Sequence, residues 1–141
     1  MNQSPVTGMD PCSENVNHLA WNPSGERFLM FNRWSGARQP TRVFTVDRNG
    51  SDLRLLSAHG ASHWTWRDDT HVLIWARGAY RLYRDNGVGE PVETVWEHPN
   101  GHQTFIPGTE HEWLITDTYP QGEESVQELC LYHIPSKKKV L

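Results

Sequence analysis

Three copies of one short pattern recur along the chain, each a histidine followed three residues later by an aromatic residue. The copies are His18-x-x-Trp21, His63-x-x-Trp66 and His102-x-x-Phe105, so the histidines are 45 and 39 residues apart. Each copy is followed by a turn and an apolar, strand-like run. A repeat of about 40–50 residues that contains several short strands is typical of β-propeller blades.

The repeat divides the chain into an irregular lead-in, residues 1–16, and three units at about residues 17–58, 59–98 and 99–141. Gly, Pro, Asn and Asp residues separate the strand-like runs within each unit, and no window keeps apolar residues at helical spacing. In the third unit we expect strands at about 102–106, 113–116 and 126–132, with an outer strand starting only at Val140. We therefore predict an all-β fold of about three four-stranded antiparallel blades, an incomplete ring.

An incomplete ring has a physical consequence, because propellers typically close with about four to eight blades. Three blades leave an apolar blade face at each end, which monomeric proteins seldom tolerate. The missing neighbours would be further blades on a longer polypeptide or other copies of the chain.

Composition narrows the choice of partner and compartment. The net charge of −4 argues against duplex nucleic acid, and the run Lys137-Lys138-Lys139 is interpreted as a solvated turn. No apolar stretch reaches the ~20 residues that cross a bilayer, and the first fifteen residues lack the features of a signal peptide. We expect a soluble, cytoplasmic protein in which Cys12 and Cys130 are free thiols, although one disulfide remains an alternative.

In a propeller the first strand of each blade lines the central channel, so His18, His63 and His102 should lie near one another. The second strand returns antiparallel, and its last residue should lie beside the start of the first. That position is occupied by a charged residue in every unit, and in the third unit Tyr119 lies two residues after it. The charged residues are Arg33, Arg77 and Asp117.

Two interpretations of these residues remain open. Neutral imidazoles suit first-row divalent metal ions, so His18, His63, His102 and Asp117 are candidate ligands. Arg33, Arg77 and Tyr119 would then bind an anionic ligand. Alternatively, each histidine is a structural latch that hydrogen-bonds to backbone or carboxylate. We interpret the aromatic residues of the repeat as packing between blades rather than a sugar-stacking platform.

Parts of the chain resemble a known family. The turn Pro23-Ser24-Gly25 and the segment Asn49-Gly50-Ser51-Asp52-Leu53 are similar to the turns of TolB-type propeller repeats. The segments 62–68 and 101–120 resemble the later blades of bacterial oligogalacturonate lyase-like propellers. The resemblance covers about residues 17–135. Its most specific feature is that the first strand of each of the three units carries a histidine.

The lyase resemblance implies a manganese ion held by His18, His63 and His102. The family's additional glutamine ligand falls on Gly60, and its base and partner arginine lie on blades that have no counterpart here. It further implies binding of an acidic oligosaccharide and β-elimination in the intact family. We expect this chain alone to bind metal and carboxylate but to be inactive.

Two other functions remain possible from the sequence. A non-catalytic TolB-type propeller would act as a scaffold for a protein or peptide. A carbohydrate-binding module without catalysis would fit the seven tryptophans.

Overall fold

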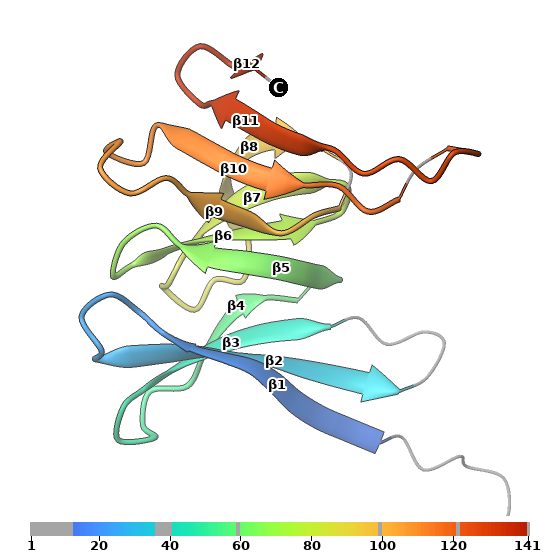
Figure 1. The fold of residues 1–141 in the computed structure, drawn as a ribbon. Helices are drawn as coiled ribbons and strands as arrows, with labels where there is room; N and C mark the ends of the chain where they lie inside the picture. Colours follow the sequence, from blue (N-terminus) through green and yellow to red (C-terminus); the bar gives the residue numbers. More distant parts are fainter. Residues whose placement is uncertain (1–12, 36–40, 59, 99, 121, 141) are drawn as a thin grey trace, which may run out of the picture.

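The computed structural model describes residues 13–35, 41–58, 60–98, 100–120 and 122–140, and all the regular structure in these ranges is β-strand (Figure 1). The first sheet contains β1 (Ser13–Trp21), β2 (Arg27–Ser35), β3 (Arg42–Asp47) and β4 (Arg54–Ser57). The second contains β5 (Ala61–Trp66), β6 (His71–Ala76), β7 (Ala79–Arg84) and β8 (Pro91–Glu97). The third contains β9 (Gln103–Phe105), β10 (Trp113–Asp117), β11 (Leu129–His133) and β12 (Lys138–Lys139).

Each sheet is an antiparallel meander in which strands pair in chain order. The prediction of an all-β chain made of three four-stranded antiparallel units is therefore confirmed. None of the described residues forms a helix that could span a membrane.

The turns follow from local chemistry. Between β1 and β2, Asn22 Oδ1 accepts hydrogen bonds from the backbone of Glu26 and Arg27, at 3.0 and 3.1 Å. Between β6 and β7, Arg77 and Gly78 both have positive φ, at 52° and 77°. Two consecutive residues with positive φ form the hairpin turn that matches the natural twist of paired strands.

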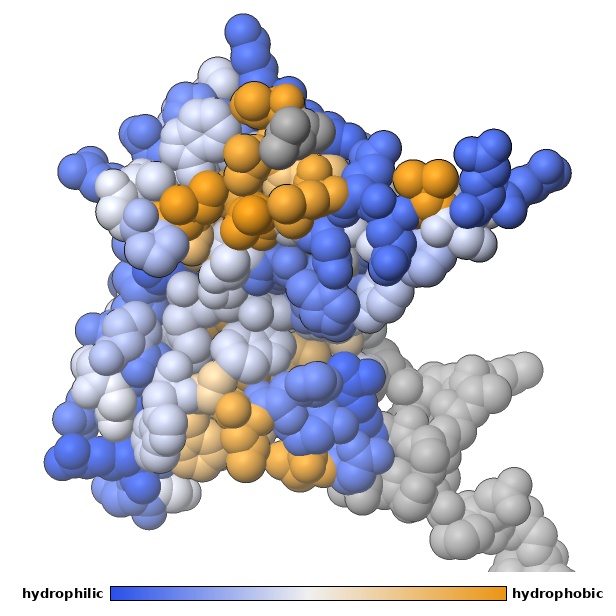
Figure 2. Space-filling view, viewed as in Figure 1, coloured by the Kyte–Doolittle hydropathy of each residue, from blue (hydrophilic) through white to orange (hydrophobic). Residues whose placement is uncertain are grey.

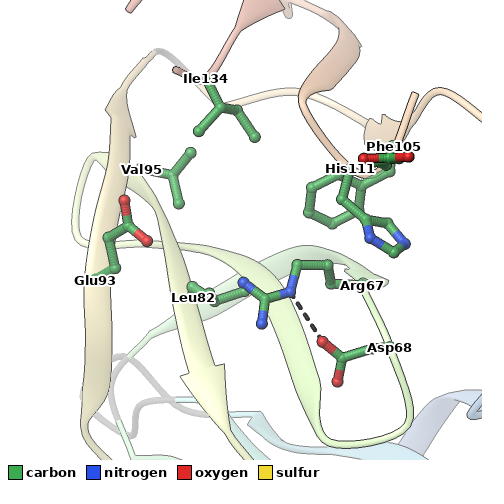
Figure 3. A pocket seen from close by; sticks show the side chains of 9 residues that line it. Arg67, Asp68, Leu82, Glu93, Val95, Phe105, His111 and Ile134 are labelled. Carbon is green, nitrogen blue, oxygen red and sulfur yellow. Dashed lines mark hydrogen bonds and ion pairs between the residues drawn. The ribbon is translucent and has the colours of Figure 1, made fainter.

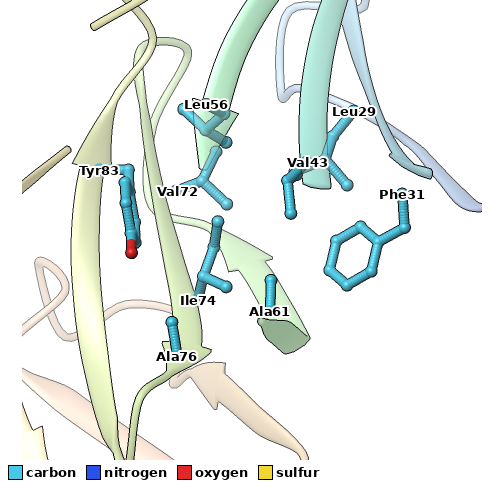
Figure 4. Packing of buried hydrophobic residues seen from close by; sticks show 9 residues of the cluster. All are labelled: Leu29, Phe31, Val43, Leu56, Ala61, Val72, Ile74, Ala76 and Tyr83. Carbon is cyan, nitrogen blue, oxygen red and sulfur yellow. The ribbon is translucent and has the colours of Figure 1, made fainter. Parts of the chain in front are cut away.

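The three sheets stack face to face, with the second sheet between the other two (Figure 1). Strand β6 makes this possible because its consecutive residues point to opposite faces and four of its six residues are buried. Val72 and Ile74 belong to the cluster shared with the first sheet, drawn in Figure 4. Leu73 belongs to the cluster shared with the third sheet. Two separate cores therefore hold the stack together.

Charged residues also join the first and second sheets. The Arg27 side chain is 10% exposed and the Asp85 side chain 2%, and Arg27 Nε lies 2.7 Å from Asp85 Oδ2. Arg27 also pairs with Asp47 and Asp52, while Thr45 Oγ1 donates to Asp85 at 2.6 Å. A buried arginine needs this many acceptors because an uncompensated charge is costly away from water.

Several expected boundaries were wrong. Strand β1 begins at Ser13, inside the segment expected to be irregular, while residues 1–12 lie outside the described residues. Strands β9 and β11 span 103–105 and 129–133 rather than 102–106 and 126–132. The outer strand of the third sheet is Lys138–Lys139, within the run interpreted as a solvated turn. Backbone pairing with Tyr132 and His133 forms it while both lysines stay exposed.

The aromatic residues of the repeat have unequal surroundings. Trp66 packs on the core between the first and second sheets, and Phe105, 8% exposed, belongs to the core between the second and third. Both are packing residues, as predicted. Trp21 is 55% exposed and contacts Phe28, so the prediction of packing between sheets does not hold there. The described residues include no sheet before the first one that could cover it.

Candidate functional site

Two histidines of the repeat lie at irregular points of first strands, and the third lies just before one. The pairing register of β1 is interrupted between Asn17 and Ala20, and His18 there has a φ of 55°. The register of β5 is interrupted between Ala61 and Trp64, around His63. His102 immediately precedes β9. Bulges of this kind re-aim side chains and are common next to functional sites.

The structure places all three histidines on one cavity of about 260 Å³, whose other lining residues are Phe31, Trp64 and Gln103. The rings of His63 and His102 have centroids 4.0 Å apart. His18 makes an edge contact with Phe31 at 5.2 Å. Residues 84 positions apart in the chain thus share one site, as the repeat indicated.

Tyr119 and Asp117 extend the site. The hydroxyl of Tyr119 lies 2.8 Å from His63 Nε2, and its ring is 5.7 Å from the ring of His102. Asp117 ends β10, and its Oδ1 accepts the backbone N–H of His102 at 2.6 Å. His102 Nδ1 lies 3.0 Å from Asp117 Oδ2. This contact fixes the ring and leaves Nε2 of His102 for another partner.

Gly101 is what permits this approach. A Cβ atom at this position would lie 1.8 Å from the backbone oxygen of Asp117. Only glycine therefore lets the chain before β9 come close enough for the His102 backbone to donate to Asp117.

The surroundings keep the imidazole of His63 neutral. Burial, followed by the neighbouring His102, lowers the pKa of His63 from 6.5 to about 4, although Asp117 opposes this shift. Burial and then Arg33 also lower the pKa of His18. Burial would raise the pKa of Asp117, but hydrogen bonds from the backbone and ring of His102 outweigh it, so this pKa is lowered. The site therefore combines the neutral imidazoles of His18 and His63 with the ionised carboxylate of Asp117 near pH 7.

Gln103 is a site residue that our reading of the sequence missed. It is 5% exposed, and its Nε2 donates to the backbone oxygens of His63 and Leu73, at 3.0 and 3.2 Å. Its Oε1 is buried and has no hydrogen-bond partner among the described residues. Its position next to a repeat histidine was the available signal, but sequence alone does not show which way a short strand turns its side chains.

The two predicted arginines differ. Arg33 lies over the ring of Phe31, 5.5 Å from its centroid, and contributes to the electrostatics of His18 and His63. Its Nε is buried without a hydrogen-bond partner among the described residues. Arg77 lies in the exposed turn after β6 and is not one of the residues that line the cavity. The structure thus brings Arg33 towards the site but not Arg77, because β6 ends one residue before it.

As the side chains stand, no three His, Cys, Asp or Glu residues in the described part of the chain are placed to hold a metal ion together. Cys130 is buried and free, whereas Cys12 lies outside the described residues.

A second cavity of about 310 Å³ lies between the second and third sheets (Figure 3). Its lining is mixed, with Leu82 and Val95 beside charged residues such as Glu93. The Nε of Arg67 is already paired with Asp68 at 2.9 Å. This cavity contains none of the three repeat histidines, so we place the candidate site at the histidine cavity.

Comparison with protein-family models, curated proteins and solved structures gave no match. The resemblance to TolB-type and oligogalacturonate lyase-like propellers therefore stays a prediction.

Proposed function

We propose that this chain forms three blades of a β-propeller and that the histidine cavity binds an acidic sugar, or a similar small anion, through a divalent metal ion. The observation that carries the proposal is the convergence of His18, His63 and His102 from three different sheets on one cavity. Equivalent residues of successive units meet in this way when the first strands surround a common axis. The face-to-face stacking of the sheets supports the same arrangement.

Three imidazoles suit a borderline ion such as zinc, whereas manganese, a harder ion, would rely more on oxygen donors. Metal ligation requires unprotonated imidazole, and the pKa of His63, lowered to about 4, leaves that ring neutral at pH 7. The buried Oε1 of Gln103 adds an oxygen donor on the same cavity. The ligands would be the three histidines and Gln103, with Asp117 orienting His102. Tyr119 would have to give up its hydrogen bond to His63 Nε2 if that nitrogen ligated a metal.

A bound divalent ion would supply positive charge to neutralise the carboxylate of a uronate. The chain's own residues would complete the recognition. Arg33 carries a guanidinium group with an unpaired buried Nε, which can donate to a carboxylate. Tyr119, 44% exposed, offers a hydroxyl at the edge of the site. We assign no catalytic base, so the proposed function is binding.

The test is to equilibrate the protein with Mn²⁺ or Zn²⁺, remove free ion and measure metal per chain. We expect about one ion per chain for the wild type, a loss for His63→Ala, and retention for the control His133→Ala, because His133 lies in β11 away from the cavity. Galacturonate oligomers should bind the metal-loaded protein and be released by a chelator. Absence of retained metal in both wild type and His63→Ala would reject the metal site.

A second candidate function is a non-catalytic scaffold for a protein or peptide. The observation that favours it is the Asp117–His102 contact, which is the kind of structural latch that a purely architectural histidine makes. In that case His102→Ala would lower the stability of the fold while metal and sugar binding would be absent from the wild type.

A further inference from the structure

Each of the two end sheets has one apolar face that none of the described residues covers. On the first sheet, Phe28 and Met30 alternate with the buried Leu29 and Phe31, so they point away from the second sheet. With Trp21 they form what we call the leading face. On the third sheet, Ile115 and Leu131 pair across the strands and alternate with residues of the core. With Val140, which is 56% exposed, they form the trailing face. Figure 2 shows apolar surface over both end sheets.

The leading face is of the same kind as two faces that are covered inside the molecule. Each first strand carries the repeat aromatic opposite a second-strand residue, in the pairs Trp21–Phe28, Trp66–Val72 and Phe105–Leu114. In the second and third sheets this face packs on the preceding sheet. Phe105 is 8% exposed there, whereas Trp21 is 55% exposed. A sheet with a suitable apolar face would cover Trp21 in the same way.

The trailing face resembles the face of the second sheet that packs on the third sheet. In the second sheet, the paired residues Leu73 and Leu82 point towards the third sheet and are buried by it. Ile115 and Leu131 hold the same positions in the third sheet but are only half-buried. At one end the molecule therefore has a face of the kind that packs on a preceding sheet. At the other end it has a face of the kind that packs on a following sheet.

We propose that a second copy of this chain occupies both faces, with the trailing face of each copy packed on the leading face of the other. Such a head-to-tail contact is heterologous, and it forms a closed assembly only if the rotation from copy to copy closes. Two copies would bring six sheets around one axis, within the typical range of about four to eight blades, whereas three copies would exceed it. The inference shares the radial arrangement with the proposed function but does not depend on metal or sugar.

The test measures molar mass by light scattering across a dilution series. We expect the wild type to have twice the chain mass at high concentration. Trp21→Glu alters only the leading face and Leu131→Glu only the trailing face, so each variant alone should be monomeric. Val92→Glu is the matched control, because Val92 is 56% exposed on β8, outside both faces, and this variant should remain a dimer.

Mixing the two variants gives the decisive result. One undamaged leading face and one undamaged trailing face then remain, so a one-to-one heterodimer should form. Dimers of either variant alone would instead indicate contacts between like faces and would overturn the proposal, as would a wild type that stays monomeric or a mixture without heterodimer. If either variant fails to fold by circular dichroism, the more exposed Leu19→Glu and Val140→Glu replace them, since Leu19 lies beside Trp21 and Phe28.

Discussion

His63 links the residues of the histidine cavity through both its side chain and its backbone. Its ring contacts His102 and the hydroxyl of Tyr119, while its backbone oxygen accepts a hydrogen bond from Gln103. Burial favours the neutral ring because charge is poorly solvated away from water. The neutral state is also the one that can ligate a metal.

The lowered pKa of His63 makes stability depend on pH. In the unfolded chain a histidine titrates near 6.5, whereas the pKa of His63 in the fold is about 4. The unfolded state therefore binds more protons between these values, and the free energy of unfolding should fall as pH drops from about 6.5 towards 4. NMR titration of the ring, and urea unfolding of wild type and His63→Gln at pH 7 and pH 5, check this.

The charged and titratable groups that face His63 also affect its pKa, so they must be considered when the titration is interpreted. His102, Asp117, His18 and Arg33 all contribute to its electrostatics, so the rings of His18 and His102 should be followed in the same titration. His63→Gln should lose less stability on acidification than the wild type. A His63 ring that titrates near 6.5 in the folded protein would contradict the prediction.

At the scale of elements, the contact between the first and second sheets combines an apolar core with a buried ion cluster. The apolar part is drawn in Figure 4, and the ion cluster around Arg27 and Asp85 lies at another part of the same contact. Apolar packing tolerates small shifts between sheets, whereas charge-assisted hydrogen bonds require one geometry. The cluster therefore fixes how the two sheets are aligned.

Removing Arg27 should be costly. Arg27→Ala leaves the carboxylate of Asp85 buried without its closest cation, and we expect a loss of about 3 kcal/mol in the free energy of unfolding, measured in urea. Arg48→Ala is the control, because its pair with Glu26 is exposed, with side chains 65% and 59% accessible, and should cost about 0–1 kcal/mol. Equal losses in the two variants would show that Arg27 is not the key residue of this contact.

At the scale of the whole molecule, the described residues cover the second sheet on both faces and each neighbouring sheet on one. Strands β6 and β7 therefore contribute to both apolar clusters, whereas each end sheet contributes to one and has an apolar outer face. Burial of such faces is the main favourable contribution to association.

If the chain dimerises as proposed, its thermal stability should depend on concentration. Folded chains associate and unfolded chains do not, so mass action raises the melting temperature as protein concentration increases. Trp21→Glu should abolish this dependence without changing the histidine cavity, which Trp21 does not line. Scanning calorimetry over a wide concentration range checks it, and a wild-type melting temperature that is independent of concentration would contradict the prediction.

The repeat of histidine, aromatic and turn residues was sufficient to predict three four-stranded units and to group His18, His63 and His102. Both depend on local patterns, namely alternation along strands and turn residues between them, which sequence records directly. The sequence also marked Tyr119, Asp117 and Arg33 as neighbours of this group. It did not mark Gln103, and it placed Arg77 at a site that the turn after β6 keeps away from the cavity.

Tertiary structure alone decided the rest. The directions in which the side chains of His18 and His63 point depend on interruptions in strand pairing. The pKa of His63, in the second sheet, depends on burial and on groups from the first and third units. The unequal exposure of Trp21 and Phe105, two residues of the same pattern, depends on whether a preceding sheet is present to cover them. Sequence specifies which face of a strand is apolar, because side chains alternate along it, but what covers that face is determined by how whole sheets pack.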